Sequence, residues 1–168
     1  MRYTPAALAL SLLATLTSSV IYSAPRESLL PRTSVLLAEG RAALALQQYN
    51  KAIDAFEAAL VVQPGSVSVL LNLAEATREQ GMQGKALHYY REALESDPRN
   101  LAAIAGEGAA LAEKGAVEKA RRNLARLKGM CGSDCEETRL LADVIAKGPE
   151  PRVLTAEALK PDPVISDN

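Results

Sequence analysis

Two cysteines, Cys131 and Cys135, are the side chains of this sequence best suited to covalent chemistry. A disulfide between them would close a small ring, and such a bond persists in an oxidising compartment. A redox-active pair is an alternative, because a thiol near a helix N-terminus ionises more readily. However, three residues separate the cysteines instead of the usual two, and no thioredoxin-like strand pattern surrounds them. We therefore expect a structural Cys131–Cys135 disulfide, and free thiols remain the third possibility.

Metal binding and catalysis have few candidate residues. A closed zinc shell would need His88, the single histidine, and a fourth ligand such as Asp134 to join the cysteines. His88 stands beside two tyrosines in a helical pattern, where a histidine is commonly a packing residue. No Gly-rich phosphate loop and no Ser-His-Asp or Cys-His arrangement is recognisable. We expect no catalytic residue, no metal and no cofactor.

The charge balance and composition indicate a helical protein without a nucleic-acid partner. The chain has 19 Lys and Arg against 20 Asp and Glu, a formal net charge of -1. Carboxylates such as Glu57, Glu92, Glu95 and Glu118 alternate with basic residues, as on solvated helix faces. No basic stripe of the kind that phosphate backbones require is expected. Hydrophobic residues make up 48%, with one Phe and no Trp, which favours helices packed through small side chains.

The elements that must position these residues form an internal repeat. Four sets of residues recur at intervals of 34: Leu36, Leu70 and Ile104; Gly40, Ala74 and Gly108; Ala52, Ala86 and Ala120; and Phe56, Tyr90 and Leu124. A fixed period of this length is typical of one helical hairpin used several times, each burying its apolar face against the next. A non-repetitive helical bundle is the alternative.

The first two units resemble the tetratricopeptide repeat signature W-x2-L-G-x2-Y, A-x3-F, P. The matching residues are Leu36-x2-Glu39-Gly40-x2-Ala43, Ala52-x3-Phe56 and Pro64, then Leu70-x2-Leu73-Ala74, Ala86-x3-Tyr90 and Pro98. The third unit departs from the signature, with Glu107 at the usual Leu and Gly132 where Pro would stand. The resemblance covers about Thr33 to Lys128. It implies an all-α, right-handed solenoid of about three hairpins, and a C-terminal capping helix would close its end.

The resemblance also implies a binding site. In this family the first helix of each hairpin lines a concave groove that holds a peptide or a helix of another protein. The groove residues expected from it are Leu37, Arg41, Leu44, Asn72, Glu75, Arg78, Ala105 and Ala109. Asn72 would bind a ligand backbone or bridge neighbouring helices, and Arg41 and Arg78 would pair with a carboxylate or stay solvated.

The residues at the matching positions argue against one subtype of the family, the carboxylate clamp. The carboxylate clamp that captures chaperone tails resembles a set of Lys, Asn and Arg, and the matching positions here read Leu37, Arg41, Asn72, Ala102 and Gly106. Asn72 agrees and Arg41 is a partial substitute. Because the third-repeat end is rich in Ala and Gly, we expect an apolar peptide or an amphipathic helix as the ligand.

The N-terminal segment predicts export. After Arg2, no Asp, Glu, Lys, Arg or His occurs in residues 3–24, whose centre is an apolar run at 6–14. A cleaved signal peptide is the first interpretation, and a retained anchor through residues 3–24 is the alternative, since about 20 apolar residues span a bilayer. We expect a periplasmic or secreted protein, or one anchored in the inner membrane if the signal stays uncleaved.

The remaining boundaries follow from prolines, glycines and the repeat interval. The expected segments are a signal or anchor (1–24), a linker (25–32), a repeat domain (33–147) and a Pro-containing, disordered tail (148–168). Within the domain, repeats span about 33–66, 67–100 and 101–132, and a capping helix spans 133–147. Pro25 and Pro31 discourage helix in the linker. Ser133 and Glu136 are predicted to form a capping box at the start of the last helix.

Together these observations favour a non-catalytic adaptor of the bacterial cell envelope. It would dock a segment of an envelope or secretion protein in the concave groove of the repeats. A periplasmic thiol-disulfide factor using Cys131 and Cys135 is a second hypothesis, and a repeat protein that assembles with its own copies is a third.

Overall fold

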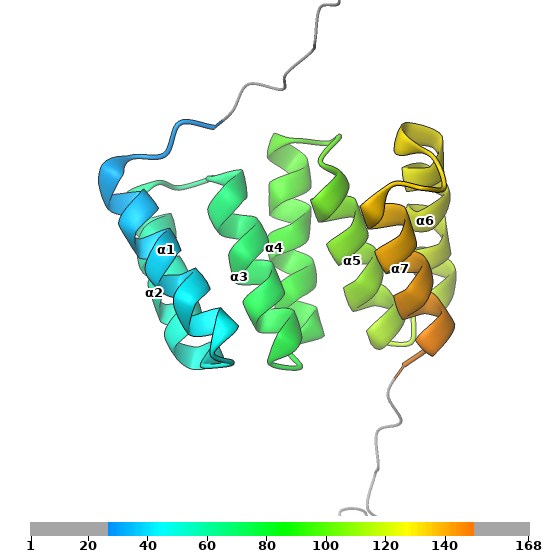
Figure 1. The fold of residues 1–168 in the computed structure, drawn as a ribbon, viewed down its shortest axis with the longest axis horizontal. Coiled ribbons are helices and arrows are strands. Elements are labelled where there is room, and N and C mark those ends of the chain that lie inside the picture. Colours follow the sequence, from blue (N-terminus) through cyan, green and yellow to red (C-terminus); the bar gives the residue numbers. More distant parts are fainter. Residues whose placement is uncertain (1–26, 150–168) are drawn as a thin grey trace, which may run out of the picture.

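The computed structural model describes residues 27–149, which form seven α-helices and no strand (Figure 1). The helices are α1 (Pro31–Ala45), α2 (Tyr49–Val62), α3 (Val67–Glu79), α4 (Gln83–Ser96), α5 (Leu101–Glu113), α6 (Val117–Cys131) and α7 (Glu136–Lys147). The predicted export segment and the tail beyond Pro149 lie outside the described residues. None of the described helices has the length and apolarity that a membrane crossing requires.

The helices stack as a row of antiparallel hairpins. The pairs α1–α2, α3–α4 and α5–α6 each pack as a hairpin, and α7 packs against α5 and α6 at the end of the row. Each second helix also contacts the first helix of the next hairpin. As a result α1, α3, α5 and α7 lie on one side of the molecule (Figure 1). This arrangement confirms the predicted all-α solenoid of three hairpins with a terminal helix.

The turn inside each hairpin uses the same backbone geometry. Gln47, Gly81 and Gly115, spaced 34 residues apart, all have a positive φ, of 57°, 83° and 88°. The residue that follows each donates its backbone N–H to a carbonyl in the last turn of the helix, at 2.8–2.9 Å. This is the Schellman pattern, which suits glycine because a side chain is strained at positive φ. The first hairpin places a glutamine in that strained position.

The first helices of the second and third hairpins begin at side-chain caps. Ser66 Oγ accepts the Val69 N–H at 3.3 Å, and Asn100 Oδ1 accepts the Ala103 N–H at 3.0 Å. Each bond satisfies one of the backbone donors that a helix N-terminus leaves free. These caps fix where α3 and α5 start, and both helices contribute to the site described below.

The end of the predicted linker is part of the folded domain. Helix α1 starts at Pro31, so the expectation that Pro31 discourages helix was wrong; proline is compatible with the first helical position, where its missing N–H costs nothing. Glu27 accepts the Ser68 N–H at 2.9 Å, and Gln63 Oε1 accepts the Leu30 N–H at 2.9 Å. Residues 27–30 are therefore fastened to the end of α2 and the start of α3.

The predicted capping box at the last helix is also wrong. Helix α7 starts at Glu136, its N-cap is Cys135, and no side chain there makes a capping bond. Thr138 instead donates its hydroxyl to the Gly132 carbonyl at 2.9 Å and lies 3.0 Å from Cys135 Sγ. The helix starts after the second cysteine, so Ser133 stands too far upstream to cap it.

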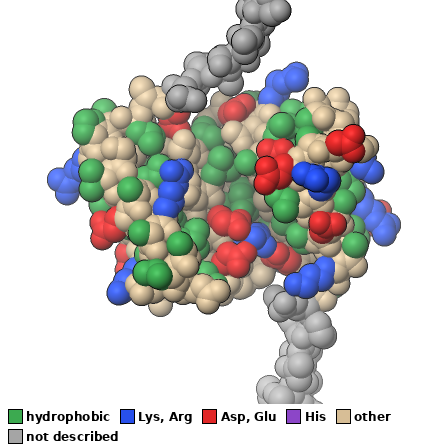
Figure 2. All heavy atoms as spheres, viewed as in Figure 1, with side chains coloured by type: hydrophobic (Ala, Val, Ile, Leu, Met, Phe, Trp, Pro, Cys, Tyr) green, Lys and Arg blue, Asp and Glu red, His purple; other side chains and the backbone are tan. Residues whose placement is uncertain are grey.

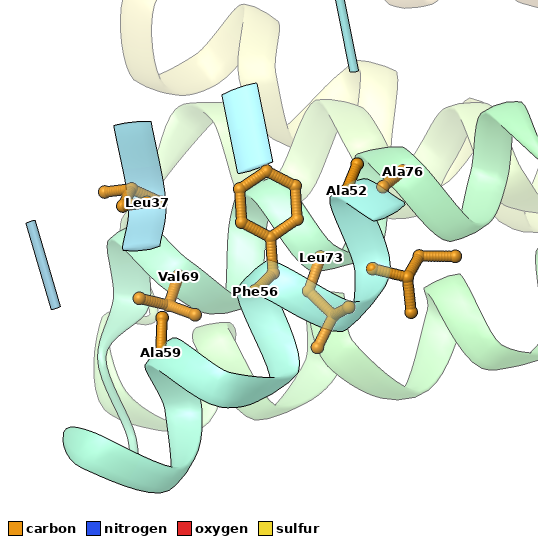
Figure 3. Packing of buried hydrophobic residues seen from close by; sticks show 8 residues of the cluster. Leu37, Ala52, Phe56, Ala59, Val69, Leu73 and Ala76 are labelled. Carbon is orange, nitrogen blue, oxygen red and sulfur yellow. The ribbon is translucent and has the colours of Figure 1, made fainter. Parts of the chain in front are cut away.

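The core of the first hairpin is built around one aromatic ring. Phe56 is fully buried and clusters with Leu37, Ala59 and with Val69 and Leu73 of the next hairpin (Figure 3). The ring fits because Gly40 faces it: a Cβ on Gly40 would lie 2.3 Å from Phe56 Cε1. Side chains from two hairpins share this cluster, so neither hairpin buries its apolar face alone.

Candidate functional site

A groove lies on the side of the molecule formed by the first helices. It holds a cavity of about 580 Å³, lined by residues of α3, α5 and α7 and by Tyr90 of α4. Figure 2, viewed toward this side, shows hydrophobic side chains in the middle of the face and acidic side chains near them. A volume of this size is in the range of pockets that bind ligands.

The floor of the groove is made of small residues on α5. Ala102, Ala105 and Ala109 line it at helical spacing, together with Gly106. Leu71 of α3 stands on one side, and Leu140 and Val144 of α7 stand on the other. Side chains as short as these leave room for a ligand's apolar groups, or for a helix, to approach the backbone of α5 closely.

The structure explains why residue 106 is a glycine, which the repeat pattern does not. A Cβ at this position would lie 2.3 Å from both Cε1 and Cζ of Tyr90. The Tyr90 ring is buried in the space that a side chain would fill. From there its hydroxyl donates to Glu75 Oε2 at 2.8 Å. Gly106 therefore allows α4 to deliver a hydroxyl group to the wall of the groove.

Arg78 is held by three carboxylates at one end of the groove. Its Nη2 donates to Glu75 Oε1 at 2.7 Å and to Glu79 Oε1 at 2.5 Å, and its Nε donates to Glu75 Oε2 at 3.1 Å. Its Nη1 donates to Glu113, which comes from the end of α5. The side chain of Arg78 is 16% exposed. A guanidinium with this many partners is fixed in one orientation.

The network shifts the pKa values of its members in different directions. Burial alone would raise the pKa of Glu75, but hydrogen bonds and charge attraction from Arg78, with a bond from Tyr90, lower it. Burial raises the pKa of Glu113, and Arg78 offsets that only in part. The same carboxylates raise the pKa of Arg78, although burial acts the other way. Arg78 and Glu75 thus stabilise each other as ions, whereas the protein disfavours the charged form of Glu113.

Five of the residues predicted for the groove line the cavity: Asn72, Glu75, Arg78, Ala105 and Ala109. Asn72 also bridges helices, since its Oδ1 accepts from Arg41 Nε at 3.0 Å and its Nδ2 donates to the Ser68 carbonyl at 2.7 Å. Of the two roles considered for Asn72, the bridging one is present in the structure. Arg78 was expected either to pair with a ligand carboxylate or to be solvated. This expectation was wrong, because carboxylates of the protein itself bind its guanidinium.

Leu37 and Leu44 do not line this cavity. Leu37 is 2% exposed and belongs to the Phe56 cluster, and Leu44 packs partly against the same cluster. The prediction that Leu37 is presented in the groove was therefore wrong, because its side chain is buried. Leu44 is half-buried and lies outside the cavity. Leu37 belongs to a cluster with Phe56 of α2 and Val69 of α3, whereas the corresponding Leu71 and Ala105 line the cavity. Arg41 is exposed on α1 beside Asn72.

The wall supplied by α7 was not anticipated from the sequence. Glu136, Glu137, Leu140 and Val144 all line the cavity, although α7 was expected to act as a cap alone. A signal does exist, because Leu140 follows Ala105 by 35 residues, close to the repeat interval. Helix α7 occupies the place of the first helix of a further hairpin. Helix α6 has 15 residues where α2 and α4 have 14. This one-residue change of interval hides the match from a search at a fixed period.

The two cysteines, at the end of α6 and just before α7, meet across the loop between these helices. Their Sγ atoms are 1.98 Å apart and their Cα atoms 5.9 Å apart. Glu137 brings a carboxylate oxygen close to them, and these three residues are the one group of potential metal ligands found in residues 27–149. His88 is far more exposed, with 73% of its side chain accessible, and it contacts Tyr89 and Glu92 on α4. The structure therefore brings the cysteines together but leaves His88 outside their group.

The even charge balance of the chain conceals a separation of charge. Helix α6 carries five exposed cations, namely Lys119, Arg121, Arg122, Arg126 and Lys128, against one exposed acid, Glu118. Exposed cations therefore gather on α6 although the chain as a whole is balanced. None of these residues lines the groove, which has acidic residues around it. The acidic character of the groove is thus a local property and not that of the whole surface.

Comparison with known proteins identifies the fold. Residues 33–99 match the family model described as tetratricopeptide repeat. The Sgt2 TPR domain from Aspergillus fumigatus superposes with a TM-score of 0.63 at 28% identity, covering 86% of this chain and 95% of that domain. The described part of the chain has the tetratricopeptide repeat (TPR) fold. The prediction drawn from the first two repeats is thereby confirmed.

Two further proteins are similar to this chain. The heat-shock protein cognate co-chaperone sgt12 of Aspergillus fumigatus is 32% identical over 130 residues, an alignment that covers 72% of this chain. This chain spans 38% of the length of that relative. The first TPR of Spaghetti, bound to the HSP90 peptide SRMEEVD, has a TM-score of 0.62 at 20% identity and covers 69% of this chain and 92% of that one. That this chain is an exported bacterial member of the family stays a prediction.

Proposed function

We propose that this TPR domain is a non-catalytic scaffold that binds a peptide segment or a helix of another protein in its concave groove. The observation that carries the proposal is the cavity between α3, α5 and α7, whose floor is Ala and Gly and whose wall includes the 56% exposed Leu140. An apolar side chain left this accessible gains free energy when a partner covers it.

The groove is built to bind with little reorganisation. Tyr90, Glu75, Arg78 and Glu113 are connected by hydrogen bonds from three helices, α3, α4 and α5. A wall whose side chains are already fixed loses little conformational entropy on binding, so more of the contact energy appears as affinity.

Related proteins support peptide binding as the mode of action. The first TPR of Spaghetti is bound to an HSP90 peptide, and the similar protein sgt12 is a co-chaperone. This chain has Ala102 and Gly106 at positions where the clamp for chaperone tails has cationic side chains. We therefore propose an apolar segment or an amphipathic helix as the ligand, docked as helices dock in grooves.

The location and process belong to the same proposal. The apolar segment at residues 3–24 supports export, by a cleaved signal or a retained anchor. A partner in the cell envelope or a secretion apparatus would then be within reach of the groove.

A disulfide between Cys131 and Cys135 fits that location. It would fix the loop that positions α7, which supplies one wall of the groove. Denaturing the purified protein without reductant, alkylating it with iodoacetamide and weighing it by mass spectrometry tests the bond. No adduct is expected, and two adducts on freshly purified protein would refute the disulfide.

The groove itself is tested by a pair of substitutions at exposed leucines. Leu140→Asp places a charge in the groove, and Leu46→Asp places the same charge at the end of α1, where the leucine is 68% exposed. After mild crosslinking in its native cells, the tagged wild type and the Leu46→Asp variant should retain the same partner. The Leu140→Asp variant, verified as folded by circular dichroism, should lose it. Equal capture by all three proteins would show that the partner binds elsewhere.

A further inference from the structure

We propose that the segment bound in this groove carries a lysine or arginine beside its apolar residues, and that the groove discriminates against acidic segments. The inference rests on the proposed function above and specifies the chemistry of the partner. It is argued from the charges that surround the cavity and from the partners those charges already have.

The cation of the cavity is not available to a ligand. Arg78 lines the cavity, but its guanidinium is taken up by Glu75, Glu79 and Glu113. An arginine recognises a carboxylate by offering two parallel N–H groups in a fork. Glu75 already accepts from Nε and Nη2 of Arg78 in that way. An incoming carboxylate would have to displace Glu75 and also meet the negative charge of its neighbours.

The cluster around Arg78 has more negative than positive charge. Three carboxylates surround one guanidinium, so the fully ionised cluster has a net charge of -2. Glu113 Oε2 is buried and accepts no hydrogen bond from any described residue. An unbalanced cluster at the wall of a concave, partly apolar surface projects a negative potential into the groove.

The opposite wall adds two more carboxylates. Glu136 and Glu137 line the cavity from the first turn of α7. Among residues 27–149, no Lys or Arg lies within the 4.0 Å of an ion pair from either of them. Both walls of the cavity are therefore acidic, and the Ala floor lies between them. A basic residue that flanks an apolar stretch matches this pattern on either side.

The groove has a cation beyond the cavity, and its position gives the site a direction. Arg41 is exposed on α1, the helix farthest from α7 along the row, and its Nε donates to Asn72. The cation Arg41 thus lies at the α1 side of the groove, and the carboxylates Glu136 and Glu137 lie at the α7 side. A bound segment should place its lysine or arginine toward α7. The substitutions tested below are therefore made at Glu136 and Glu137 of that helix.

The test uses two fluorescein-labelled peptides of about 14 residues with blocked ends, long enough to span a groove of this kind. They share one Leu, Ala and Gln sequence and differ at two positions near one end, both Lys or both Glu. Binding to the full chain is measured by fluorescence anisotropy. At about 20 mM salt the Lys peptide should bind at least about fivefold more tightly, and the difference should shrink at about 500 mM salt, where charges are screened.

Two charge-matched variants locate the selectivity. Glu136→Gln with Glu137→Gln removes two negative charges from the groove, and Glu95→Gln with Glu118→Gln removes two that do not line the cavity. The first variant should lose most of the preference for Lys, and the second should keep it. Circular dichroism establishes that both are folded.

The outcomes separate this inference from the proposed function. If both peptides bind with equal affinity, or the Glu peptide binds better, and Leu140→Asp abolishes binding, the groove is a docking site but the charge inference is wrong. If the Lys preference persists in the Glu136→Gln, Glu137→Gln variant, the inference is wrong as well. If neither peptide binds at about 1 mM, a Kd that marks a very weak complex, the inference fails, and the partner-capture experiment then decides the proposed function independently.

Discussion

Replacing Gly106 with alanine tests whether the groove wall is assembled as described. In most helix positions this change is stabilising by about 1 kcal/mol, because alanine favours helix more than glycine does. Here the added Cβ would lie 2.3 Å from Cε1 and Cζ of Tyr90 and 2.7 Å from its Oη. Carbon atoms in contact are normally about 3.5–4.0 Å apart. The Tyr90 ring must therefore retreat by more than about 1 Å.

The retreat has two costs that together exceed the gain in helix propensity. Overpacking of a well-filled site costs about 1–3 kcal/mol. Moving the Tyr90 hydroxyl away from Glu75, 2.8 Å distant, loses a hydrogen bond to a charged group, worth about 1.5–3 kcal/mol. We expect Gly106→Ala to lower the free energy of unfolding by about 2–4 kcal/mol.

Urea denaturation followed by circular dichroism measures the effect, with Gly129→Ala as the matched control. Gly129 also lies in a helix, but apart from the adjacent residues and the nearby backbone of its own helix, no atom of the described residues lies within 4 Å of the Cβ it would gain. The control should be neutral or stabilised by about 0.5 kcal/mol. In the double variant Gly106→Ala, Tyr90→Leu, the destabilisation should be smaller than the sum of the single effects by about 1 kcal/mol or more, because the two residues share one space.

Two results would contradict this reasoning. If Gly106→Ala is as stable as the Gly129→Ala control, the ring of Tyr90 does not occupy the space beside Gly106. If the effects of Gly106→Ala and Tyr90→Leu are additive, the destabilisation has a cause other than their contact. In either case the hydrogen-bonded wall of the groove would not be as rigid as the proposed function requires.

Three further measurements test other parts of the structure. Gln47→Gly should raise the free energy of unfolding by about 0.5–1 kcal/mol, because residue 47 has a φ of 57°; an unchanged or lower urea midpoint would contradict the turn geometry. Phe56→Ala should cost about 3–5 kcal/mol, and Val61→Ala, at a side chain 81% exposed, less than about 0.5 kcal/mol; similar losses would mean that Phe56 is not in the core. Glu75→Gln should cost about 1 kcal/mol at neutral pH, a modest value because the carboxylate is 41% exposed. The pKa of Glu75 is lowered by folding, so its stabilisation is complete above the ordinary pKa of 4.5 and is lost as the pH falls below it; a difference from wild type that persists at low pH would refute this.

The sequence predicted the architecture well because the repeat is a local property. The 34-residue interval, with Gly40 opposite Phe56 and the glycines of the hairpin turns, is enough to place the first six helices. The groove positions on α3 and α5 follow from the same interval, which is why Asn72, Ala105 and Ala109 line the cavity as expected. Helix α7 was assigned only a capping role because α6 is one residue longer than α2 and α4, which changes the interval to 35 residues.

The partners of the groove residues could not be predicted in the same way. Arg78 and Glu113 stand 35 residues apart on different hairpins, and nothing in their spacing tells an ion pair from two solvated charges. Leu37 and Leu71 occupy equivalent repeat positions, yet one is buried and the other borders the cavity. The difference depends on the neighbouring side chains, since Leu37 clusters with Phe56 and Val69, whereas Leu71 shares the cavity with the small residues of α5.

What the amino-acid sequence determines by itself is therefore the helices, their turns and their stacking order. These depend on contacts between residues within one repeat or in neighbouring repeats, and such contacts recur with the period of the chain. Only the tertiary structure decides the chemistry of the groove. Its acidic walls, the engagement of Arg78 and the contribution of α7 arise where side chains from separate repeats converge, and side-chain charges combine there in a way that no single repeat encodes.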